Sequence, residues 1–313
     1  MPSFQQNFSV VDSLVFQERA KVVTINPLVF PDQDGGFLVV ENGEHQVRVY
    51  SRTGELKEVF GDGAAEARSL RAPTGAARLG NKEIVATSLL SNRLTIIPAP
   101  PDQPVRYSET PIRPLEGVQV LDEHQLLLTG PDAPYAKNML HIWDLERRGI
   151  TRSFFPPPSH VDSNVVLVLG RVHVASRGDR LAVLHSLSDT LFLYDHAGSL
   201  VSSIHVPVEE FNAPKGPLPT INSTEKRQEW ANQWTLLWDV FWGEDNTLIV
   251  QWVKGRRGQA TYGLVQMDTA GRRIWALART PRLLGVRDGR FLFQGSAPTA
   301  PNRMVVAVRR DTP

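Results

Sequence analysis

Short apolar segments separated by turns recur along the whole chain, and within many of them apolar and polar positions alternate. In one clear copy, the apolar run Phe37-Leu-Val-Val is followed by the turn Asn42-Gly-Glu-His and the alternating segment Gln46-Val-Arg-Val-Tyr. A period of two is typical of strands, and Gly, Asn and Asp between apolar segments indicate turns. The pattern therefore predicts β-sheets built from short strands.

The same order of segments occurs six times. Each copy has one alternating segment that ends in an apolar anchor, and these anchors are Tyr50, Ile97, Trp143, Tyr194, Met267 and Ala307. The intervals between anchors are 40 to 51 residues, apart from one of 73 residues. Four short strands repeated at this period are typical of a β-propeller, in which stacked blades bury each other's apolar faces. We therefore expect residues 1–313 to form a single all-β domain, a six-bladed β-propeller.

The two ends of the chain are expected to complete the last blade. The sixth copy contains the strand Met304–Val308 but no fourth strand after it, and the segment Phe8–Phe16 precedes the first copy without a partner. Pairing the N-terminal strand with the last blade would close the ring and remove free strand edges.

The interval of 73 residues is explained by an insertion at 206–235, between the fourth and fifth copies. Asn222-Ser-Thr-Glu resembles a helix start, with Asn222 accepting from first-turn amides and Glu225 reaching back, and predicts a short helix over about 224–234. Trp230 and Trp234 would lie on one face of it. They form either an aromatic lid over the channel mouth, or the contact that packs the insertion onto the propeller.

Composition and charge narrow the range of possible functions. The net charge of +1 gives no general attraction to nucleic acid or anionic membranes, and no apolar run approaches the length of a transmembrane helix. The absence of cysteine excludes thiolate catalysis and disulfides. Residues 252–310 nevertheless contain twelve Lys and Arg but only two Asp, a basic sector suited to carboxylates or phosphates, or else a solvated face beside acidic neighbours.

The first two copies resemble a known repeat. Val40-Glu-Asn-Gly-Glu-His-Gln-Val-Arg-Val-Tyr-Ser-Arg-Thr-Gly-Glu-Leu and Leu70-Arg-Ala-Pro-Thr-Gly-Ala-Ala resemble the NHL repeat, and the whole chain resembles NHL-related and TolB-like bacterial propellers. The repeat's Asp, Asn and Arg are replaced here by Glu41, Glu44 and Gln46. The resemblance implies the fold and, because such proteins are often exported, a periplasmic or secreted location. The N-terminus lacks the basic and apolar regions of a signal peptide.

Candidate site residues lie in the loops between second and third strands and in the loops that lead into each blade, since these gather at one end of a propeller. For a ligand we expect the aromatic and basic side chains Trp230, Trp234, Arg256, Arg257, Arg279, Arg282 and Arg303. For a metal, Ca²⁺ or Zn²⁺, we expect the carboxylates and imidazoles Glu41, His45, His160, Asp162, His185 and Asp189, which could equally be ordinary loop residues. His173, between two valines, is expected to be a satisfied interior histidine.

Two functions follow from these patterns. The first is a binding propeller, expected to be a monomer, for an anionic or aromatic-bearing small ligand or a protein partner at the channel mouth. The second is a metal-dependent hydrolase or lyase with its site in the axial channel, as in the propeller lactonases and esterases that this layout loosely resembles. Motifs for phosphate loops, dinucleotide binding, Gly-x-Ser-x-Gly nucleophiles and His-Glu-x-x-His zinc sites are absent from the sequence.

Overall fold

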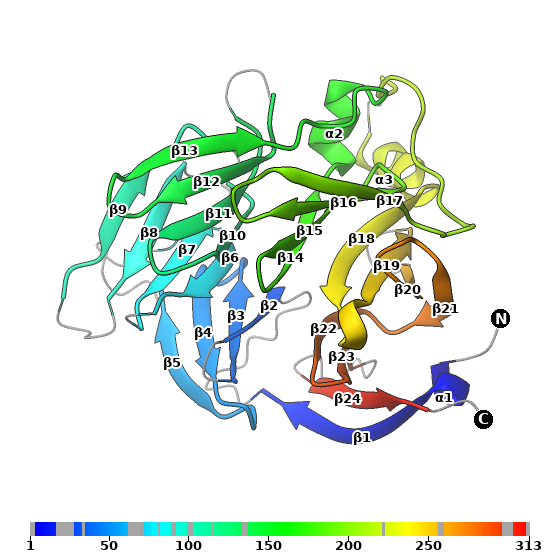
Figure 1. The fold of residues 1–313 in the computed structure, drawn as a ribbon, viewed down its shortest axis with the longest axis horizontal. Helices are drawn as coiled ribbons and strands as arrows, with labels where there is room; N and C mark the ends of the chain where they lie inside the picture. The colour runs from blue at the N-terminus through cyan, green and yellow to red at the C-terminus, as the bar shows by residue number, and fades with distance from the viewer. Residues whose placement is uncertain are drawn as a thin grey trace. The chain divides into compact units, whose positions relative to one another are not determined.

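The computed structural model contains six antiparallel four-stranded sheets, the six blades of a β-propeller (Figure 1). It describes residues 4–16, 28–32, 35–61, 70, 72–80, 82–88, 92–98, 103–113, 115–132, 137–220, 223–255, 260–295 and 303–310. The chain divides into two compact units, which are described separately. One contains Ser13–Pro156 and Gln294–Val305, and the other contains Met1–Asp12, Pro157–Phe293 and Val306–Pro313.

The first unit contains blades 1 to 3, and in each blade consecutive strands pair as neighbours. Blade 1 consists of β2 (Leu28–Pro31), β3 (Phe37–Glu41), β4 (Gln46–Tyr50) and β5 (Leu56–Phe60). Blade 2 consists of β6 (Pro73–Arg78), β7 (Ile84–Ser88), β8 (Arg93–Ile97) and β9 (Arg106–Glu109). Blade 3 consists of β10 (Gly117–Val120), β11 (Gln125–Thr129), β12 (Leu140–Asp144) and β13 (Gly149–Phe154).

The second unit contains blades 4 and 5 and most of blade 6. Blade 4 consists of β14 (Val172–Arg177), β15 (Arg180–His185), β16 (Thr190–Asp195) and β17 (Leu200–His205). Blade 5 consists of β18 (Thr235–Trp242), β19 (Leu248–Lys254), β20 (Thr261–Met267) and β21 (Arg273–Thr280). Blade 6 consists of β22 (Leu283–Arg287), β23 (Arg290–Gln294), β24 (Arg303–Arg309) and β1 (Phe8–Val15).

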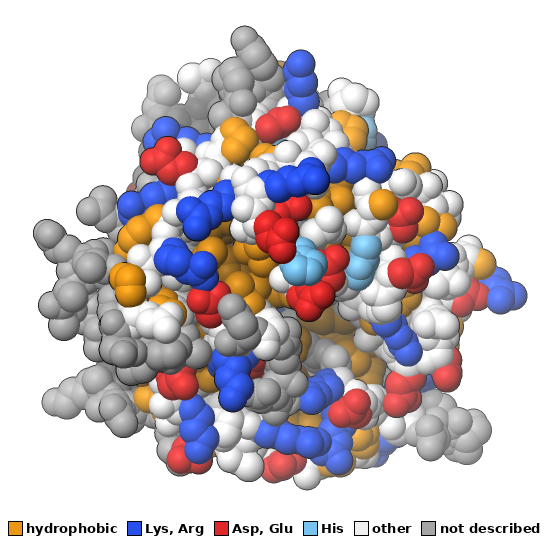
Figure 2. All heavy atoms as spheres, turned by 60° about the vertical axis from the view of Figure 1, so that its left-hand side comes forward, with side chains coloured by type: hydrophobic (Ala, Val, Ile, Leu, Met, Phe, Trp, Pro, Cys, Tyr) orange, Lys and Arg blue, Asp and Glu red, His pale blue; other side chains and the backbone are white. Residues whose placement is uncertain are grey.

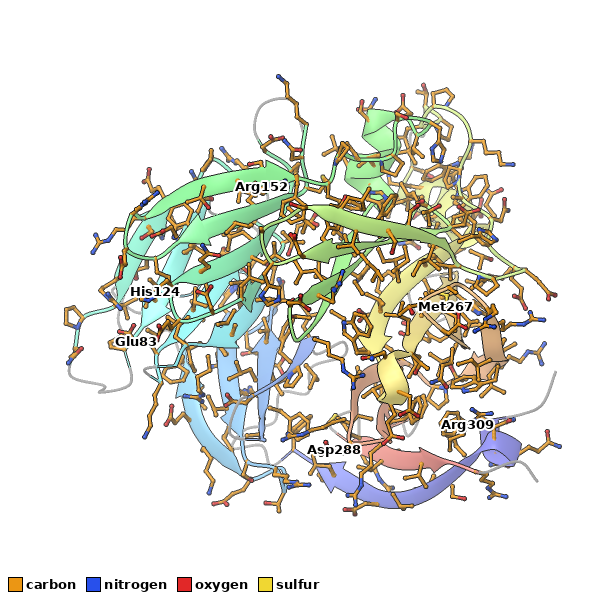
Figure 3. The ribbon with its side chains drawn as sticks, viewed as in Figure 1. Glu83, His124, Arg152, Met267, Asp288 and Arg309 are labelled. Atoms are coloured by element: carbon orange, nitrogen blue, oxygen red, sulfur yellow. The ribbon has the colours of Figure 1, made fainter. Side chains whose placement is uncertain are left out.

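The N-terminal strand completes the last blade, as the sequence predicts. The order in this sheet is β1-β24-β23-β22, and the backbone N–H of Arg310 donates to the carbonyl of Asn7 at 2.8 Å. Phe8, preceded by the short helix α1 (Phe4–Asn7), is buried and contacts the rings of Phe291 and Phe293. The guanidinium of Arg309, which is labelled in Figure 3, lies over the Trp275 ring, 5.2 Å from its centre.

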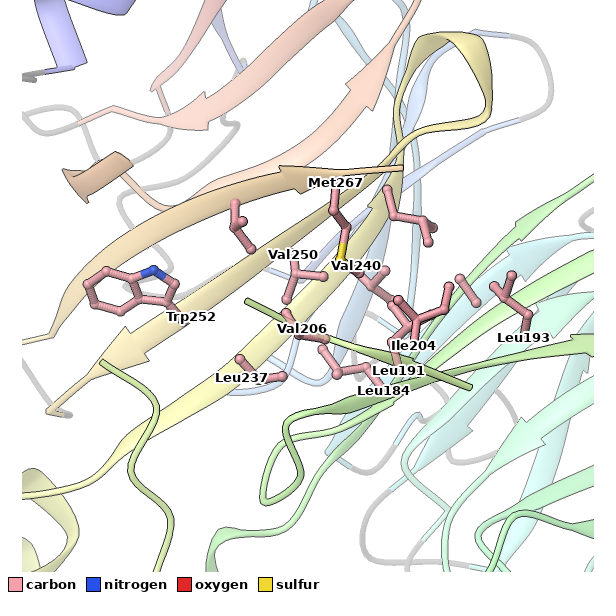
Figure 4. Packing of buried hydrophobic residues seen from close by; sticks show 13 residues of the cluster. Leu184, Leu191, Leu193, Ile204, Val206, Leu237, Val240, Val250, Trp252 and Met267 are labelled. Atoms are coloured by element: carbon pink, nitrogen blue, oxygen red, sulfur yellow. The ribbon is translucent and has the colours of Figure 1, made fainter. Parts of the chain in front are cut away.

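The apolar cores lie between adjacent blades. Between blades 4 and 5, Leu184, Leu191 and Ile204 pack against Val250 and Met267 (Figure 4). In β19 the cluster members Leu248, Val250 and Trp252 occupy alternate positions, so the period-two pattern of the sequence becomes one face of the sheet. The first unit has equivalent clusters between blades 1 and 2 and between blades 2 and 3.

Two helices lie before blades 4 and 5. The predicted helix of the insertion is α3 (Thr224–Asn232), but its cap is Ser223, whose hydroxyl accepts from the Lys226 N–H at 3.2 Å. The cap is therefore one residue later than predicted, and Asn222 lies outside the described residues. The second helix, α2 (Ser163–Leu169), was not predicted from the sequence. Asp162 caps it, with Oδ1 accepting from the N–H groups of Asn164 and Val165.

Candidate functional site

Three consecutive first strands of the second unit bring a histidine, an aspartate and an arginine together. His173 is near the start of β14 and Asp239 lies within β18, while Arg282 directly precedes β22. Nδ1 of His173 lies 3.7 Å from Oδ1 of Asp239, and the charge of Arg282 acts on both groups. First strands lie nearest the central channel of a propeller, so these side chains are placed where a ligand could reach them.

A bulge in β18 determines how these side chains are presented. The pairing with β19 shifts between Leu237 and Asp239, which makes Trp238 the bulged residue. Leu237 and Val240 consequently both face the core between blades 4 and 5, while Asp239 is paired across the strands with Gln251. Bulges of this kind re-aim individual side chains at functional positions. The ring of Trp238 lies 6.0 Å from that of His173.

The carboxyl of Asp239 has an unusual protonation equilibrium. Burial raises its pKa from 3.8 to about 7, against the opposing effects of a hydrogen bond from the Val240 N–H and the charge of Arg282. Yet 32% of the side-chain surface is still accessible. Protein atoms therefore surround a carboxyl that solvent or a small molecule can touch, and this access screens part of the burial effect.

His173 is neutral at physiological pH. Burial lowers its pKa from 6.5 to about 3, and the nearby positive charges of Arg171 and Arg282 act in the same direction. The 3.7 Å contact with Asp239 is therefore not an ion pair at neutral pH, and it is too long for a strong hydrogen bond. With two guanidinium groups and one partly ionised carboxyl, the local charge is positive at pH 7.

Several buried polar atoms around Asp239 have no hydrogen-bond partner among the described residues. They are Nε2 of His173 and the two polar side-chain atoms of Gln251, Oε1 and Nε2. The side chain of Gln251 is fully buried. Gln251 lies within β19. On the same strand the ring of Trp252 lies directly over Gly263, where a Cβ would come 2.1 Å from a ring carbon. Close packing thus fixes β19 on one side, while its polar group faces the other way.

The predicted ligand-binding residues are distributed over both units. Trp230 and Trp234, 6.0 Å apart, pack into a cluster with Val165, Leu169 and Leu236, so their apolar faces join the insertion to α2 and blade 5. Arg279 is exposed at the end of β21, and Arg303 is exposed at the start of β24. Arg256 and Arg257 lie outside the described residues. Of the predicted set, Arg282 is the residue whose charge acts on Asp239 and His173, and ligand contact by every member of the set stays a prediction.

The predicted metal ligands have other contacts. Asp162 caps α2, Nδ1 of His45 accepts from the Ala72 N–H at 2.9 Å, and Glu41 lies 4.0 Å from Arg48. Nδ1 of the fully buried His185 accepts from the Leu187 N–H, and burial lowers the pKa of His185 to about 3. Asp189 lies 3.6 Å from His205, and His160 is exposed before α2. Within the described ranges, no three His, Asp or Glu side chains form a group that could hold a metal ion. Binding of Ca²⁺ or Zn²⁺ by this set stays a prediction.

The sequence reasoning missed Asp239 and Gln251 and misjudged His173. It correctly placed His173 in the interior, but Nε2 of that ring has no partner in the described part of the chain. The available signal for Asp239 was its position as a polar residue within the apolar segment Leu236-Leu-Trp-Asp-Val-Phe-Trp.

The surface charge of one face is mixed. On the face shown in Figure 2, basic and acidic side chains are interspersed, so this face has no patch of a single charge sign.

Comparison with solved structures supports the fold. A member of the DUF4221 family from Bacteroides vulgatus matches with a TM-score of 0.66 and 10% identity, covering 97% of each chain. A protein of Bacteroides fragilis that is thought to be exported matches with a TM-score of 0.68 and 11% identity, covering 99% of this chain and 97% of the other. A catalytically inactive variant of virginiamycin B lyase from Staphylococcus aureus, with quinupristin, matches with a TM-score of 0.57 and 14% identity. The match covers 93% of this chain and 83% of the lyase chain.

These likenesses support the six-bladed propeller fold and leave the chemistry of the protein open. No family model matches the sequence, and no curated protein is significantly similar to it. None of the helices among the described residues is long and apolar enough to cross a membrane.

Proposed function

We propose that this propeller binds a small ligand that combines an acidic group with an aromatic or apolar ring. The site is formed by His173, Trp238, Asp239 and Arg282, with Arg171 nearby. The observation that carries the proposal is the partly open carboxyl of Asp239, held by burial at a pKa of about 7 between a neutral imidazole and guanidinium groups. Perturbed groups of this kind cluster at functional sites.

The chemistry of the site favours an acidic ligand. A guanidinium group forms paired hydrogen bonds with a carboxylate or phosphate, and two such groups act on His173. Asp239 would oppose an anion when ionised, but with a pKa of about 7 it can take up a proton as the anion binds. Trp238 offers a flat apolar surface for a ring. A fold that needed only stability would gain more from apolar residues at these positions.

We also propose that the protein is periplasmic or secreted, a location that fits a ligand-binding role. One structural neighbour is thought to be exported. A ligand-binding propeller outside the cytoplasm would meet small organic acids directly.

Matched small molecules test the binding proposal. 4-Phenylbutyrate and 4-phenylbutylamine share a ring and a chain but carry opposite charges, and isothermal titration calorimetry measures their affinities. We expect saturable binding of 4-phenylbutyrate and much weaker binding of the amine. Arg282→Met should weaken 4-phenylbutyrate about tenfold, the worth of one charge-assisted contact. Arg272→Met is the control, because Arg272 pairs with Asp268 in a turn of blade 5. Equal affinities for the two molecules, or an unchanged affinity in Arg282→Met, would contradict the proposal.

Catalysis at the same place is the second candidate. A carboxyl with a pKa of about 7 is suited to general acid–base chemistry at neutral pH, and solved lyases share the fold. A hydrolase or lyase would use Asp239 to accept a proton from its substrate, and the metal-dependent form would need Ca²⁺ or Zn²⁺. Elemental analysis of protein purified without chelators, with thermal melts in added Ca²⁺ or Zn²⁺, separates these forms. No bound metal and no rise in Tm would count against the metal-dependent one.

A further inference from the structure

Unpaired polar groups flank Asp239 on two sides, and the proposed binding of an acidic group does not use them. Gln251 is directly opposite Asp239 in the pairing of β18 with β19, so both side chains emerge on the same face of blade 5. His173 approaches Asp239 from blade 4. The Gln251 amide and Nε2 of His173 have no hydrogen-bond partner within the described ranges.

Such atoms are costly for a folded protein. Each buried donor or acceptor without a partner loses its hydrogen bonds to water, and nearly all such groups in native proteins are satisfied by protein, water or ligand. The loss is concentrated here, since the primary amide of Gln251 leaves both its acceptor and its donors unpaired. The partly exposed carboxyl of Asp239 is the cross-strand neighbour of this amide and provides the side from which it can be approached.

The unpaired groups share one chemical property. The Gln251 amide is neutral, with a donor and an acceptor, and the neutral imidazole of His173 has one of each. They complement a ligand group that is itself neutral and carries both a donor and an acceptor. A secondary carboxamide has this character, whereas a second carboxylate lacks the donor and an ammonium group lacks the acceptor.

We infer that Gln251, assisted by His173, is a specificity-determining residue that recognises a carboxamide beside the acidic group of the ligand. The amide of Gln251 donates to the carbonyl of the ligand and accepts from its N–H, and the carboxyl of Asp239 moves aside to admit it. The ligand class is therefore an N-acylated amino acid or a short peptide with a free carboxylate. This inference rests on the proposed function, because the carboxylate of the ligand is bound by the arginine side chains.

Hippurate and 4-phenylbutyrate test it, because they have the same ring, carboxylate and chain length and differ in the amide. With wild-type protein we expect hippurate to bind about five- to tenfold more tightly, the worth of one or two net hydrogen bonds. With Gln251→Leu, the two affinities should differ less than twofold, while 4-phenylbutyrate binds as in the wild type. Isothermal titration calorimetry supplies both numbers.

The stability of the same variant tests whether Gln251 instead holds a structural water. If the amide serves the ligand, Gln251→Leu should melt at or above the temperature of the free wild-type protein, because an unpaired polar group has been replaced by an apolar one. Gln266→Leu is the matched control on the same blade. Its amide donates to the Thr247 hydroxyl, so the loss should lower Tm and leave the preference for hippurate unchanged.

The outcomes separate the two proposals. Binding of 4-phenylbutyrate without a preference for hippurate, or a preference that survives in Gln251→Leu, overturns this inference and leaves the proposed function standing. A lower Tm of Gln251→Leu with an unchanged preference assigns the amide to a structural water and also overturns it. Failure of both molecules to bind overturns the proposed function, and this inference with it.

Discussion

Buried polar groups are used differently in the two units of this protein. In the first unit, Asp32 and Arg78 form a nearly inaccessible pair joined by hydrogen bonds of 2.8 to 3.0 Å, and both ring nitrogens of His141 have partners. In the second, His173 and Asp239 face each other at 3.7 Å, and Gln251 has no partner among the described residues. The first arrangement is complete within the protein, whereas the second leaves hydrogen-bonding capacity for another molecule.

The difference shows why burial alone does not identify a site. His141 and His173 are both interior histidines whose pKa is lowered mainly by burial. Only the contacts of the ring nitrogens distinguish a structural histidine from one available to a ligand. Substitutions that remove each group should therefore differ clearly in their consequences for stability.

Asp32→Ala should have the largest effect. It leaves the guanidinium of Arg78 buried without its carboxylate, which typically costs about 3–5 kcal/mol of unfolding free energy. Urea denaturation followed by tryptophan fluorescence measures the loss. Glu55→Ala is the control, because Glu55 and Lys57 form an exposed pair that should contribute less than about 0.5 kcal/mol. A loss below about 1 kcal/mol for Asp32→Ala would show that this pair does not stabilise the first unit as described.

Leucine substitutions of the two histidines should separate them further. His141→Leu removes the partners of the Ser153 hydroxyl and the Gly130 carbonyl and should cost about 2 kcal/mol. His173→Leu should change the unfolding free energy by less than about 0.5 kcal/mol, because its Nε2 has no partner in the described part of the chain. The same urea titration compares them. Similar losses for both variants would remove the contrast between the units.

Asp239→Asn should have a smaller effect than Asp32→Ala or His141→Leu, and the size of this effect depends on pH. The pKa of Asp239 is raised on folding from 3.8 to about 7, so the unfolded chain releases this proton first as the pH increases. The group therefore contributes most to stability below pH 4, and its contribution falls between pH 4 and 7. Asn removes this loss and should stabilise the protein at pH 8 by about 1 kcal/mol, a discounted value because a third of the side chain is exposed.

The pH dependence of that difference provides the check. His173 and His185 act in the opposite direction, since their lowered pKa values stabilise the fold above pH 6.5 and lose this effect as the pH falls toward 3. They are common to both proteins, so melting curves of wild type and Asp239→Asn from pH 4 to 8 isolate the aspartate. A gap that does not widen with pH would mean that the carboxyl titrates normally.

Much of the fold could be predicted because it depends on a local pattern. All six anchors, from Tyr50 to Ala307, lie in third strands, and the pairing of β1 with β24 followed from a missing strand. Helix α2 was missed because its sequence, Ser-Asn-Val-Val-Leu-Val-Leu, is rich in residues that favour strands. The Asp162 cap and the contacts of Val165 and Leu169 with the insertion override that preference.

The site could be predicted only in part. Arg282, whose charge acts on His173 and Asp239, was named from the basic sector, because charge is visible in the sequence. Asp239 and Gln251 were missed because their meeting depends on one bulge, which shifts the pairing of β18 with β19 by a residue. No local sequence pattern specifies that shift, and without it Asp239 would have a different cross-strand neighbour.

The joining of β1 to β24 also sets the order in which the protein can mature. Arg310 and Ser9, whose side chains bond at 2.9 Å, are 301 residues apart in sequence. During synthesis, the strand β1 has no partner until the 301 residues that separate Ser9 from Arg310 have been translated. While β1 is unpaired, its exposed residues Val10 and Val11 favour aggregation. Protection of this strand by a chaperone during synthesis would therefore increase the yield of folded protein, and it would not change the stability of the folded state.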